Sequence, residues 1–383
     1  MKFVLNETSY FGAGCVENIP AEMSAKGLTK ALVCTDASLI KCKVVDKVLA
    51  VLENAKIKYK VFSDIQPNPV VANVKKGLKV LDKCGADFII AVGGGSVIDT
   101  AKAIGIIKTN PDFADVVSLD GTAATKNKSF PIFACPTTAG TAAEVTINYV
   151  ITDPKKKKKM VCVDPNDIPV VSFIDANLMV SMPKSITSST GMDALTHAIE
   201  CVLTKGANQM SDMFALESIR IIAQNLKKAY DNGKDIEARE QMAYAQYVAG
   251  MGFSNVGLGI VHSLAHPLGA RFDVAHGLAN AILLPTVMKY NMNSDALPKY
   301  RLIAKAFGIE SEKLSDKQIA NRVIKEVEKL NASVGITQKL SSFGIKEKDL
   351  AILAKDAFND ICTGGNPRET SVEDMIELYK QVF

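Results

Sequence analysis

The strongest constraint on the fold is a change of periodicity near Met182 and Pro183. Before this point, short continuous apolar runs alternate with stretches whose apolar residues recur every three or four positions. Such runs are typical of parallel strands covered on both faces, and the three-to-four spacing is typical of helices. The predicted strands are residues 30–35, 59–62, 88–92, 130–135 and 170–174, and the predicted crossover helices are residues 44–52 and 71–81.

After Pro183 the strand pattern stops and helical patterns continue to the end of the chain, as in residues 210–226, 319–330 and 350–358. Ser315 with Gln318, and Thr370 with Glu373, have the spacing of capping boxes, which mark helix starts. Pro267 is expected to end or kink the helix around it. We therefore predict an α/β domain with a parallel, Rossmann-like sheet over residues 1–182, followed by an all-α domain over residues 183–383.

Composition excludes several classes of function. The net charge of +4 in 383 residues is too weak and too dispersed to favour nucleic acid as a partner. Apolar runs all fall short of the roughly 20 residues that span a bilayer, so no membrane association is expected. The eight cysteines include no CxxC pair, which favours a reduced, cytoplasmic chain. A small molecule is the expected partner.

A glycine turn follows the third predicted strand. Gly93, Gly94, Gly95 and Ser96 lead from that strand into a helical pattern, and this geometry directs backbone N–H groups and the helix dipole at a phosphate. The dinucleotide fingerprint is incomplete because Ile98 stands at its sixth position, so a simple tight turn is the alternative. Residues 136–141 add hydroxyls after another strand, where open α/β sheets bind ligands.

Two charged features near the predicted strands have alternative interpretations. Asp36 follows the first predicted strand, where a carboxylate could bind a ribose hydroxyl and repel a 2′-phosphate, favouring NAD over NADP. The alternative is that Asp36 caps a helix. The lysine run at residues 155–159 is expected to be a solvated turn, with a ligand contact as the alternative.

The histidine pattern predicts a metal site. All four histidines lie in the helical half, and the pairs Asp193–His197 and His262–His266 are each four residues apart, which places each pair on one helix face. Together with His276 they offer five candidates for the four protein ligands of a divalent ion, so one histidine would be free for proton transfer or substrate contact. A buried histidine is more often a hydrogen-bonded core residue. Spacing alone does not decide which histidine is not a ligand.

Nearly the whole chain resembles the iron-dependent (group III) alcohol dehydrogenases, and within them the branch that reduces lactaldehyde. The matching segments are residues 5–8 with 11–12, 93–96, 136–146, 191–200, 250–259, 262–269 and 362–369. The histidine segments mark the family. Residues 141–144 favour the lactaldehyde branch, whereas residues 270–275 depart from it.

The resemblance implies roles for particular residues. It implies that Fe²⁺, with Zn²⁺ as an alternative, is held by Asp193, His197, His262 and His276, and that His266 is catalytic beside the nicotinamide. It implies NAD(H) contacts from Asp36, Asn68, Gly94, Gly95, Ser96, Asp99, Thr137, Thr138, Thr141 and Lys159. It implies substrate contacts from Asn148, Phe253 and Cys362, although a buried structural role is the alternative for Cys362.

The implied activity is reduction of lactaldehyde to 1,2-propanediol by hydride transfer from NADH. The implied assembly is a homodimer, with pairing through residues 2–5 as one arrangement. A related activity on 1,3-propanediol or short primary alcohols is the nearest alternative. Dehydroquinate synthase-like lyases combine the same two kinds of site, but a basic cluster around the metal would be expected there, and the histidines here are flanked by Ala, Leu, Ile and Gly. A non-enzymatic metal or NAD sensor is the third alternative.

Overall fold

The computed structural model describes residues 2–383. By its internal contacts the chain divides into two units of similar size. The first comprises the residues up to Met182 together with Lys234–Tyr244, and the second comprises Pro183–Gly233 with Ala245–Phe383. Each unit is described by itself.

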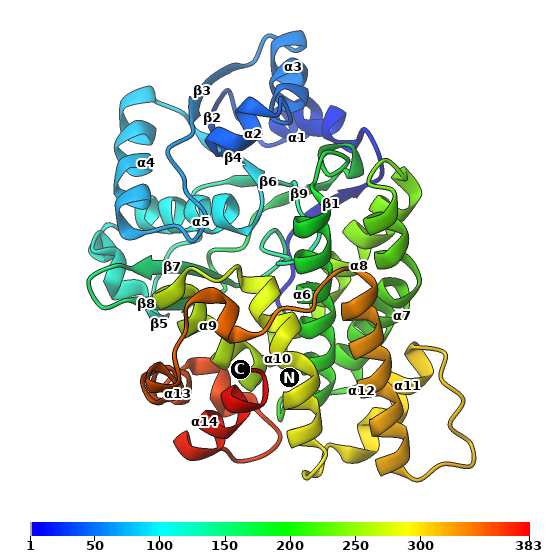
Figure 1. The fold of residues 1–383 in the computed structure, drawn as a ribbon. Helices are drawn as coiled ribbons and strands as arrows, with labels where there is room; N and C mark the ends of the chain where they lie inside the picture. The colour runs from blue at the N-terminus through cyan, green and yellow to red at the C-terminus, as the bar shows by residue number, and fades with distance from the viewer. Residues whose placement is uncertain (1) are drawn as a thin grey trace. The chain divides into compact units, whose positions relative to one another are not determined.

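The first unit is built on the predicted parallel sheet, which is confirmed (Figure 1). Every strand pair in it is parallel, as expected for strands joined by crossover helices. The short first strand was not predicted. In spatial order the strands are β1 (Thr8–Phe11), β9 (Val171–Ile174), β6 (Ile132–Pro136), β4 (Phe88–Gly93), β2 (Lys30–Cys34) and β3 (Lys58–Phe62).

Both faces of this sheet are covered, because successive side chains of a strand point to opposite faces. On β4, Ile89 and Ala91 join one apolar core, whereas Phe88 and Ile90 join the other. The first core also contains residues of α4 and α5, and the second contains residues of α1 and α3. The helices of this unit are α1 (Ile19–Ala25), α2 (Ala37–Lys41), α3 (Asp46–Asn54), α4 (Val71–Cys84) and α5 (Gly95–Thr109).

A second, three-stranded sheet in the first unit was not predicted. It consists of β5 (Gly121–Thr122), β8 (Lys158–Val163) and β7 (Asn148–Asp153), in that order. Its antiparallel hairpin, β7 with β8, has the lysine run at its turn. Lys155, Lys156 and Lys157 are exposed there, as expected for a solvated turn, but Lys159 lies in β8 and is only 8% exposed. The solvated interpretation therefore does not hold for Lys159.

Residues 234–244 group with the first unit although they follow it by some fifty residues in the chain. Three contacts join this segment to the rest of the first unit. Glu240 accepts a hydrogen bond from the Ala13 N–H (2.7 Å), the ring of Tyr244 meets that of Phe11, and Arg239 donates to the Met182 carbonyl (3.3 Å). The helix that carries this segment, α8 (Ile236–Val256), therefore contributes to both units.

The second unit consists of helices, as predicted (Figure 1). Its α6 is buried on all sides from Gly191 to Leu203, which explains the lack of a polar face in that sequence. Besides the remainder of α8, the helices are α6 (Lys184–Leu203), α7 (Gln209–Asp231), α9 (Ile260–Phe272), α10 (His276–Asn291), α11 (Tyr300–Ala306), α12 (Asp316–Ser333), α13 (Leu350–Phe358) and α14 (Val372–Gln381).

Two local predictions for this unit differ from the structure. Pro267 was expected to end or kink its helix, and it does not end it, because α9 continues to Phe272; the missing proline N–H is tolerated within a buried segment. The second capping box is one residue later than predicted, because Ser371 caps α14 and Asp374 supplies the reciprocal carboxylate. The first, Ser315 with Gln318, is confirmed.

Glycine at position 277 is required by the packing of α10 against α6. A Cβ atom at Gly277 would lie 2.2 Å from the Ser189 carbonyl oxygen, closer than atoms can approach. The first turn of α10 can therefore reach α6 only with glycine here. This contact brings His276, the preceding residue, to the helix that carries Asp193.

Between residues 2 and 383, no single helix is long and apolar enough to cross a membrane, and one bent pair, α8 with α9, passes on length and composition alone.

Candidate functional site

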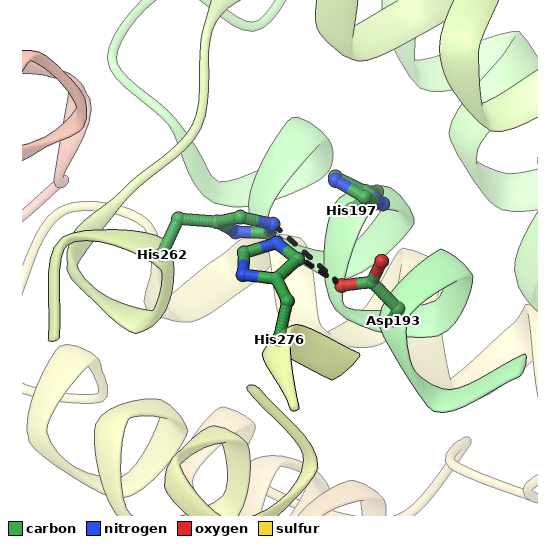
Figure 2. Close-up of side chains that lie close together, drawn as sticks. All are labelled: Asp193, His197, His262 and His276. Carbon is green, nitrogen blue, oxygen red and sulfur yellow. Dashed lines mark ion pairs between the residues drawn. The ribbon is translucent and has the colours of Figure 1, made fainter. Parts of the chain in front are cut away.

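Four side chains of the second unit converge on one point. Asp193 and His197 lie one turn apart on α6, His262 lies near the start of α9, and His276 is the first residue of α10. One potential ligand atom from each lies within 4.8 Å of those of the other three (Figure 2). The structure thus brings together the four residues that the family resemblance implied as metal ligands.

The donor set of this cluster fits a divalent transition metal. The Asp193 Oδ1 atom lies 3.6 Å from His276 Nε2 and 4.0 Å from His262 Nε2. The Asp193 side chain and that of His262 are each 2% exposed, and His276 is 25% exposed. Three imidazoles with one carboxylate suit Fe²⁺ or Zn²⁺ and lack the thiolates of most structural zinc sites. The cluster therefore fits the ion that the sequence predicts.

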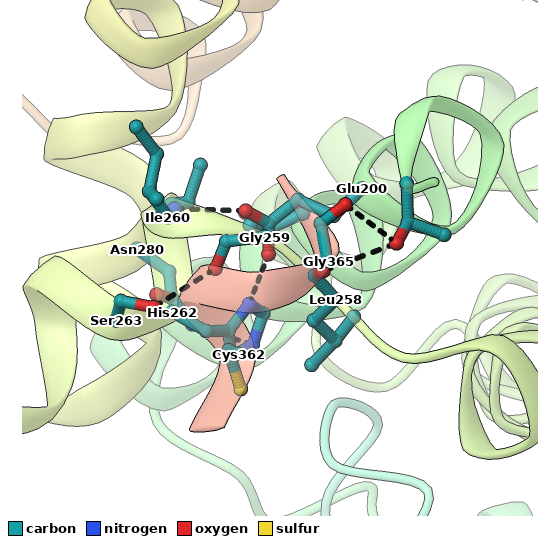
Figure 3. A network of polar contacts seen from close by, with 12 residues as sticks. Glu200, Leu258, Gly259, Ile260, His262, Ser263, Asn280, Cys362 and Gly365 are labelled. Carbon is teal, nitrogen blue, oxygen red and sulfur yellow. Dashed lines mark hydrogen bonds and ion pairs between the residues drawn. The ribbon is translucent and has the colours of Figure 1, made fainter. Parts of the chain in front are cut away.

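Glu200 fixes the orientation of His262. The Oε2 atom of this buried carboxylate lies 2.5 Å from His262 Nδ1, and its Oε1 accepts the Val261 N–H at 2.8 Å (Figure 3). Burial lowers the pKa of His262, but the charge and hydrogen bond of Glu200 raise it more, so its pKa is raised overall. With Nδ1–H donated to Glu200, the Nε2 lone pair faces Asp193, as metal-binding histidines require.

His266 belongs to a different group of side chains. Its Nδ1 lies 2.7 Å from Asp360 Oδ2, and its ring stacks on His276 at a centroid distance of 5.4 Å. Burial acts to raise the pKa of Asp360, but His266 and the Cys362 N–H outweigh burial and hold that pKa below its usual range. Asp360 therefore acts as an ionised acceptor that orients the imidazole.

Cys362 lies in the same group as His266 and Asp360. It is the second residue of a short 3₁₀ helix, Ile361–Gly365, and its N–H donates to Asp360 Oδ1 at 2.9 Å. Burial, together with the charge of Asp360, raises the pKa of its thiol well above the ordinary value. The thiol is consequently protonated near neutral pH and is a poor nucleophile.

Phe253, predicted near the substrate, packs against the metal-site residue His197. The two rings are nearly parallel, with centroids 4.2 Å apart and an interplanar angle of 10°. Phe253 is buried, so it closes one side of the His197 ring to water. This side of the cluster is apolar.

In the first unit, the glycine turn and the predicted hydroxyl residues meet at the carboxyl ends of β4 and β6. Gly94 precedes α5, and Gly95 begins it. A Cβ at Gly95 would lie 2.8 Å from the Thr141 side chain, and one at Gly94 would lie 3.1 Å from Thr138. Thr137 follows β6 and donates its N–H to the Gly93 carbonyl. The first N–H groups of α5, including that of Ser96, lack partners within the helix and suit an anion.

The other predicted cofactor residues have varied settings. Asp36 caps α2, with Oδ1 accepting the N–H groups of Ser38 (2.8 Å) and Leu39 (3.0 Å), so the capping alternative is realised for that oxygen. Asn68 has a positive φ of 52°. Asp99 accepts a hydrogen bond from the Val150 N–H at 3.0 Å. Burial raises the pKa of Asp99 to about 7, against the opposing effect of the Lys102 and Lys159 charges.

Asn148, predicted near the substrate, begins β7 and is tied to α5. Its backbone carbonyl accepts a hydrogen bond from Lys102 Nζ at 3.0 Å. Lys102 is fully buried, and it also lies 3.4 Å from the buried Asp167. The hydrogen bond from Lys102 links the helix after the glycine turn to the strand that carries Asn148.

Sequence reasoning gave no role to Glu200, Asn280, Asp360 or Lys102. A periodicity signal was available for two of them. Glu200 lies seven residues after Asp193 and three after His197, which places it on the same face of α6, and Asn280 lies four residues after His276 on α10. Asp360 lies 94 residues from His266, so no spacing rule could connect them.

Comparison with known proteins agrees with this site. Residues 6–176 match the family described as iron-containing alcohol dehydrogenase, and residues 187–383 match the C-terminal part of the Fe-containing alcohol dehydrogenase family. The chain is 51% identical to lactaldehyde reductase of Escherichia coli K12 over 378 residues, which covers 99% of this chain and 98% of that protein.

More distant relatives also match along the whole chain. The identity to 1,3-propanediol dehydrogenase of Citrobacter freundii is 40%, over 100% of this chain and 98% of that protein. Among solved structures, a 1,3-propanediol oxidoreductase superimposes with a TM-score of 0.96 at 39% identity, covering 100% of this chain and 99% of that one. The chain therefore belongs to the iron-containing alcohol dehydrogenase family.

Proposed function

We propose that this enzyme reduces lactaldehyde to 1,2-propanediol by hydride transfer from NADH, with Fe²⁺ at the cluster of Asp193, His197, His262 and His276. The observation that supports the metal role most directly is the approach of one carboxylate and three imidazoles to within 4.8 Å. The full-length identity of 51% to a lactaldehyde reductase supports the substrate.

The two parts of the chain have separate tasks in this proposal. Residues 1–182 bind NAD(H), and residues 183–383 bind the metal and the substrate. When bound, NADH supplies the hydride and Fe²⁺, or Zn²⁺ in its place, polarises the carbonyl oxygen. Both parts are needed, because the hydride donor is assigned to one part and the metal and the hydride acceptor to the other.

NAD(H) binding is assigned to the N-terminal end of α5 and the residues around it. The N–H groups of Gly94, Gly95 and Ser96 are suited to the pyrophosphate, with the hydroxyls of Thr137, Thr138 and Thr141 beside them. Asp36 has one carboxylate oxygen engaged in the helix cap, and the other is proposed to accept a ribose hydroxyl. Asn68, Asp99 and Lys159 are the remaining proposed cofactor residues.

His266 is proposed to transfer the proton that completes the alcohol. The Asp360 carboxylate accepts a hydrogen bond from Nδ1–H and stabilises the imidazolium, so the proton is exchanged at Nε2. Asp360 is then a positioning residue. Phe253, Asn148 and Cys362 are proposed to line the substrate site, with the apolar ring of Phe253 excluding water from one side of His197.

A second candidate activity is oxidoreduction of 1,3-propanediol or short primary alcohols. It is favoured by the 40% identity to 1,3-propanediol dehydrogenase and by the 38% identity to an NAD-dependent methanol dehydrogenase of Bacillus methanolicus. A one-methylene difference between substrates is worth only about 1–3 kcal/mol in a binding site. Neither the lyase nor the sensor alternative has support in the family match.

The test is an anaerobic assay of the Fe²⁺-loaded full chain. NADH oxidation would be followed with lactaldehyde, glycolaldehyde, 3-hydroxypropionaldehyde and formaldehyde, with chelator-treated protein as the control. We expect the highest kcat/KM for lactaldehyde. A higher value for 3-hydroxypropionaldehyde or formaldehyde would favour the second candidate, and no turnover of any aldehyde would reject both.

We further propose a homodimer that works in the cytoplasm. Every one of the eight cysteines carries a free thiol, which is consistent with a reducing compartment. Leu5 and Phe11, at and near the predicted pairing segment, are 41% and 46% exposed. Light scattering after size-exclusion chromatography tests the dimer, and a mass equal to one chain would reject it.

A further inference from the structure

Asn280 lies among the proposed metal ligands although it is not one of the four. It is fully buried on α10, one turn after His276. Its Nδ2 atom lies 2.6 Å from Asp193 Oδ1, 3.1 Å from His262 Nε2 and 3.2 Å from His276 Nε2. One amide nitrogen therefore contacts three of the four converging ligand atoms.

In these contacts the amide NH₂ of Asn280 takes the place that a cation would have among the ligand atoms. The three facing atoms are a carboxylate oxygen and two imidazole nitrogens, and the nitrogens must present lone pairs in order to bind metal. An amide NH₂ has two hydrogens, so it can satisfy at most two of these acceptors at once. Its partial positive charge still reduces the repulsion among them.

The carbonyl oxygen at the other end of the same amide indicates a second orientation of the side chain. Asn280 Oδ1 is buried and has no hydrogen-bond partner within residues 2–383. A buried carbonyl oxygen without a partner is costly. Rotation of the amide by half a turn exchanges oxygen and nitrogen with almost no change of shape.

A cation bound by Asp193, His262 and His276 would lie within a few ångströms of the Asn280 amide, because that amide contacts the same three ligand atoms. An NH₂ group there faces the ion with the wrong polarity, whereas a carbonyl oxygen is a suitable ligand for Fe²⁺ and similar ions. We propose that Asn280 is a further metal-site residue with two orientations: its NH₂ holds the ligand atoms together without metal, and its Oδ1 turns to the bound divalent cation. This inference rests on the proposed metal site and adds a fifth residue to it.

A simpler role makes a different prediction for one substitution. If Asn280 only donated a hydrogen bond to Asp193, Asn280→Leu would leave the Co²⁺ absorption spectrum unchanged, because no ligand of the ion would be lost. If Oδ1 faces the ion, Asn280→Asp retains an oxygen in every orientation and adds a negative charge, so metal binding would strengthen. The same substitution should destabilise the metal-free chain, because two carboxylates then face each other.

The experiment measures Co²⁺ affinity by competition with a chromophoric chelator, using the full chain. The variants are Asn280→Leu, which keeps the shape without the polar atoms, and Asn280→Asp. The control is Asn225→Leu, which removes a buried amide that donates within α7, to the Ile221 carbonyl. Circular dichroism and thermal unfolding in chelator establish that each protein is folded.

We expect Asn280→Leu to bind Co²⁺ about 10- to 100-fold more weakly, with a Co²⁺ absorption spectrum changed in intensity by the loss of one ligand. Asn280→Asp should bind at least about 10-fold more tightly but unfold at a lower temperature in chelator. The Asn225→Leu control should match the wild type in affinity. A folded Asn280→Leu with the wild-type Co²⁺ spectrum, or weaker binding by Asn280→Asp, overturns the inference. No Co²⁺ binding by the wild type overturns the proposed metal site as well, so the two failures are distinguishable.

Discussion

The Nδ1 atom of His262 lies 2.5 Å from the carboxylate of Glu200, and both side chains are at most 5% exposed. A buried carboxylate in this position selects the His262 tautomer whose Nε2 lone pair is available to a metal. The pair lies on two different helices, α6 and α9, so it also ties together the helices that carry the cluster.

We expect Glu200→Gln to weaken metal binding about 10- to 100-fold, because the amide keeps the shape but loses the charge that orients His262. Competition with a chelator measures the affinity. Glu217→Gln, at an exposed ion pair with Arg220 on α7, is the matched control and should bind as the wild type does. Equal affinities for both variants would contradict the positioning role.

Removing the imidazole of His266 should affect turnover rather than metal content. His266→Ala is expected to lower kcat about 10²- to 10⁴-fold, the usual contribution of a proton-transfer group. Asp360→Asn should give a smaller loss in the same direction, since the ring remains but its ionised partner does not. Elemental analysis should find near-normal metal in both variants. Loss of metal from His266→Ala would instead make His266 a ligand.

The charge of Asp36 should set the preference for NAD(H) over NADP(H), and the role of Asp36 as the cap of α2 can be tested separately. Asp36→Asn keeps a capping oxygen but removes the charge, whereas Asp36→Gly removes both. Both variants should raise the ratio of kcat/KM for NADPH over NADH about tenfold, the factor that about 1.4 kcal/mol of lost repulsion gives. Asp46→Asn, at the start of α3, is the control. An unchanged ratio in Asp36→Asn would reject the proposed role.

The buried pair of Lys102 and Asp167 should make stability depend on pH. Burial raises the pKa of Asp167 to about 8, against the opposing effect of Lys102, whereas the ordinary value is 3.8. Between about pH 4 and pH 8, Asp167 therefore keeps a proton in the folded state that it has released in the unfolded state. This contribution to stability is fully present below the lower pKa and is lost as pH rises through the higher one.

Urea unfolding of the wild type and of Asp167→Asn between about pH 5 and pH 8 checks this prediction. The wild type should lose about 1.4 kcal/mol of unfolding free energy per pH unit more than the variant does, the value for one proton. Asp82→Asn, at an exposed ion pair with Lys108 in the same unit, is a suitable control. Parallel pH profiles for the wild type and Asp167→Asn would show that Asp167 is already ionised in the folded state.

Local patterns were sufficient for most of the elements that form the first sheet. The buried run of β4 and the three-to-four spacing of α4 depend on residues close in the chain, and both were predicted. The hairpin of β7 and β8 was missed because the lysine run dominated its sequence, although Tyr149 and Ile151 alternate with polar or less buried neighbours as on a half-buried strand. The continuation of α9 through Pro267 was missed because packing on all sides stabilises the helix beyond its own propensity.

Sequence by itself determined that Asp193 and His197 share one face of a helix, and that His262 and His266 share another, because a helix repeats every 3.6 residues. It did not determine which of the later histidines faces Asp193. Only the tertiary structure groups His262 and His276 with Asp193 and pairs His266 with Asp360. The distance between two helices depends on side-chain packing between residues far apart in the chain, such as Gly277 against Ser189, and no spacing within one helix contains that information.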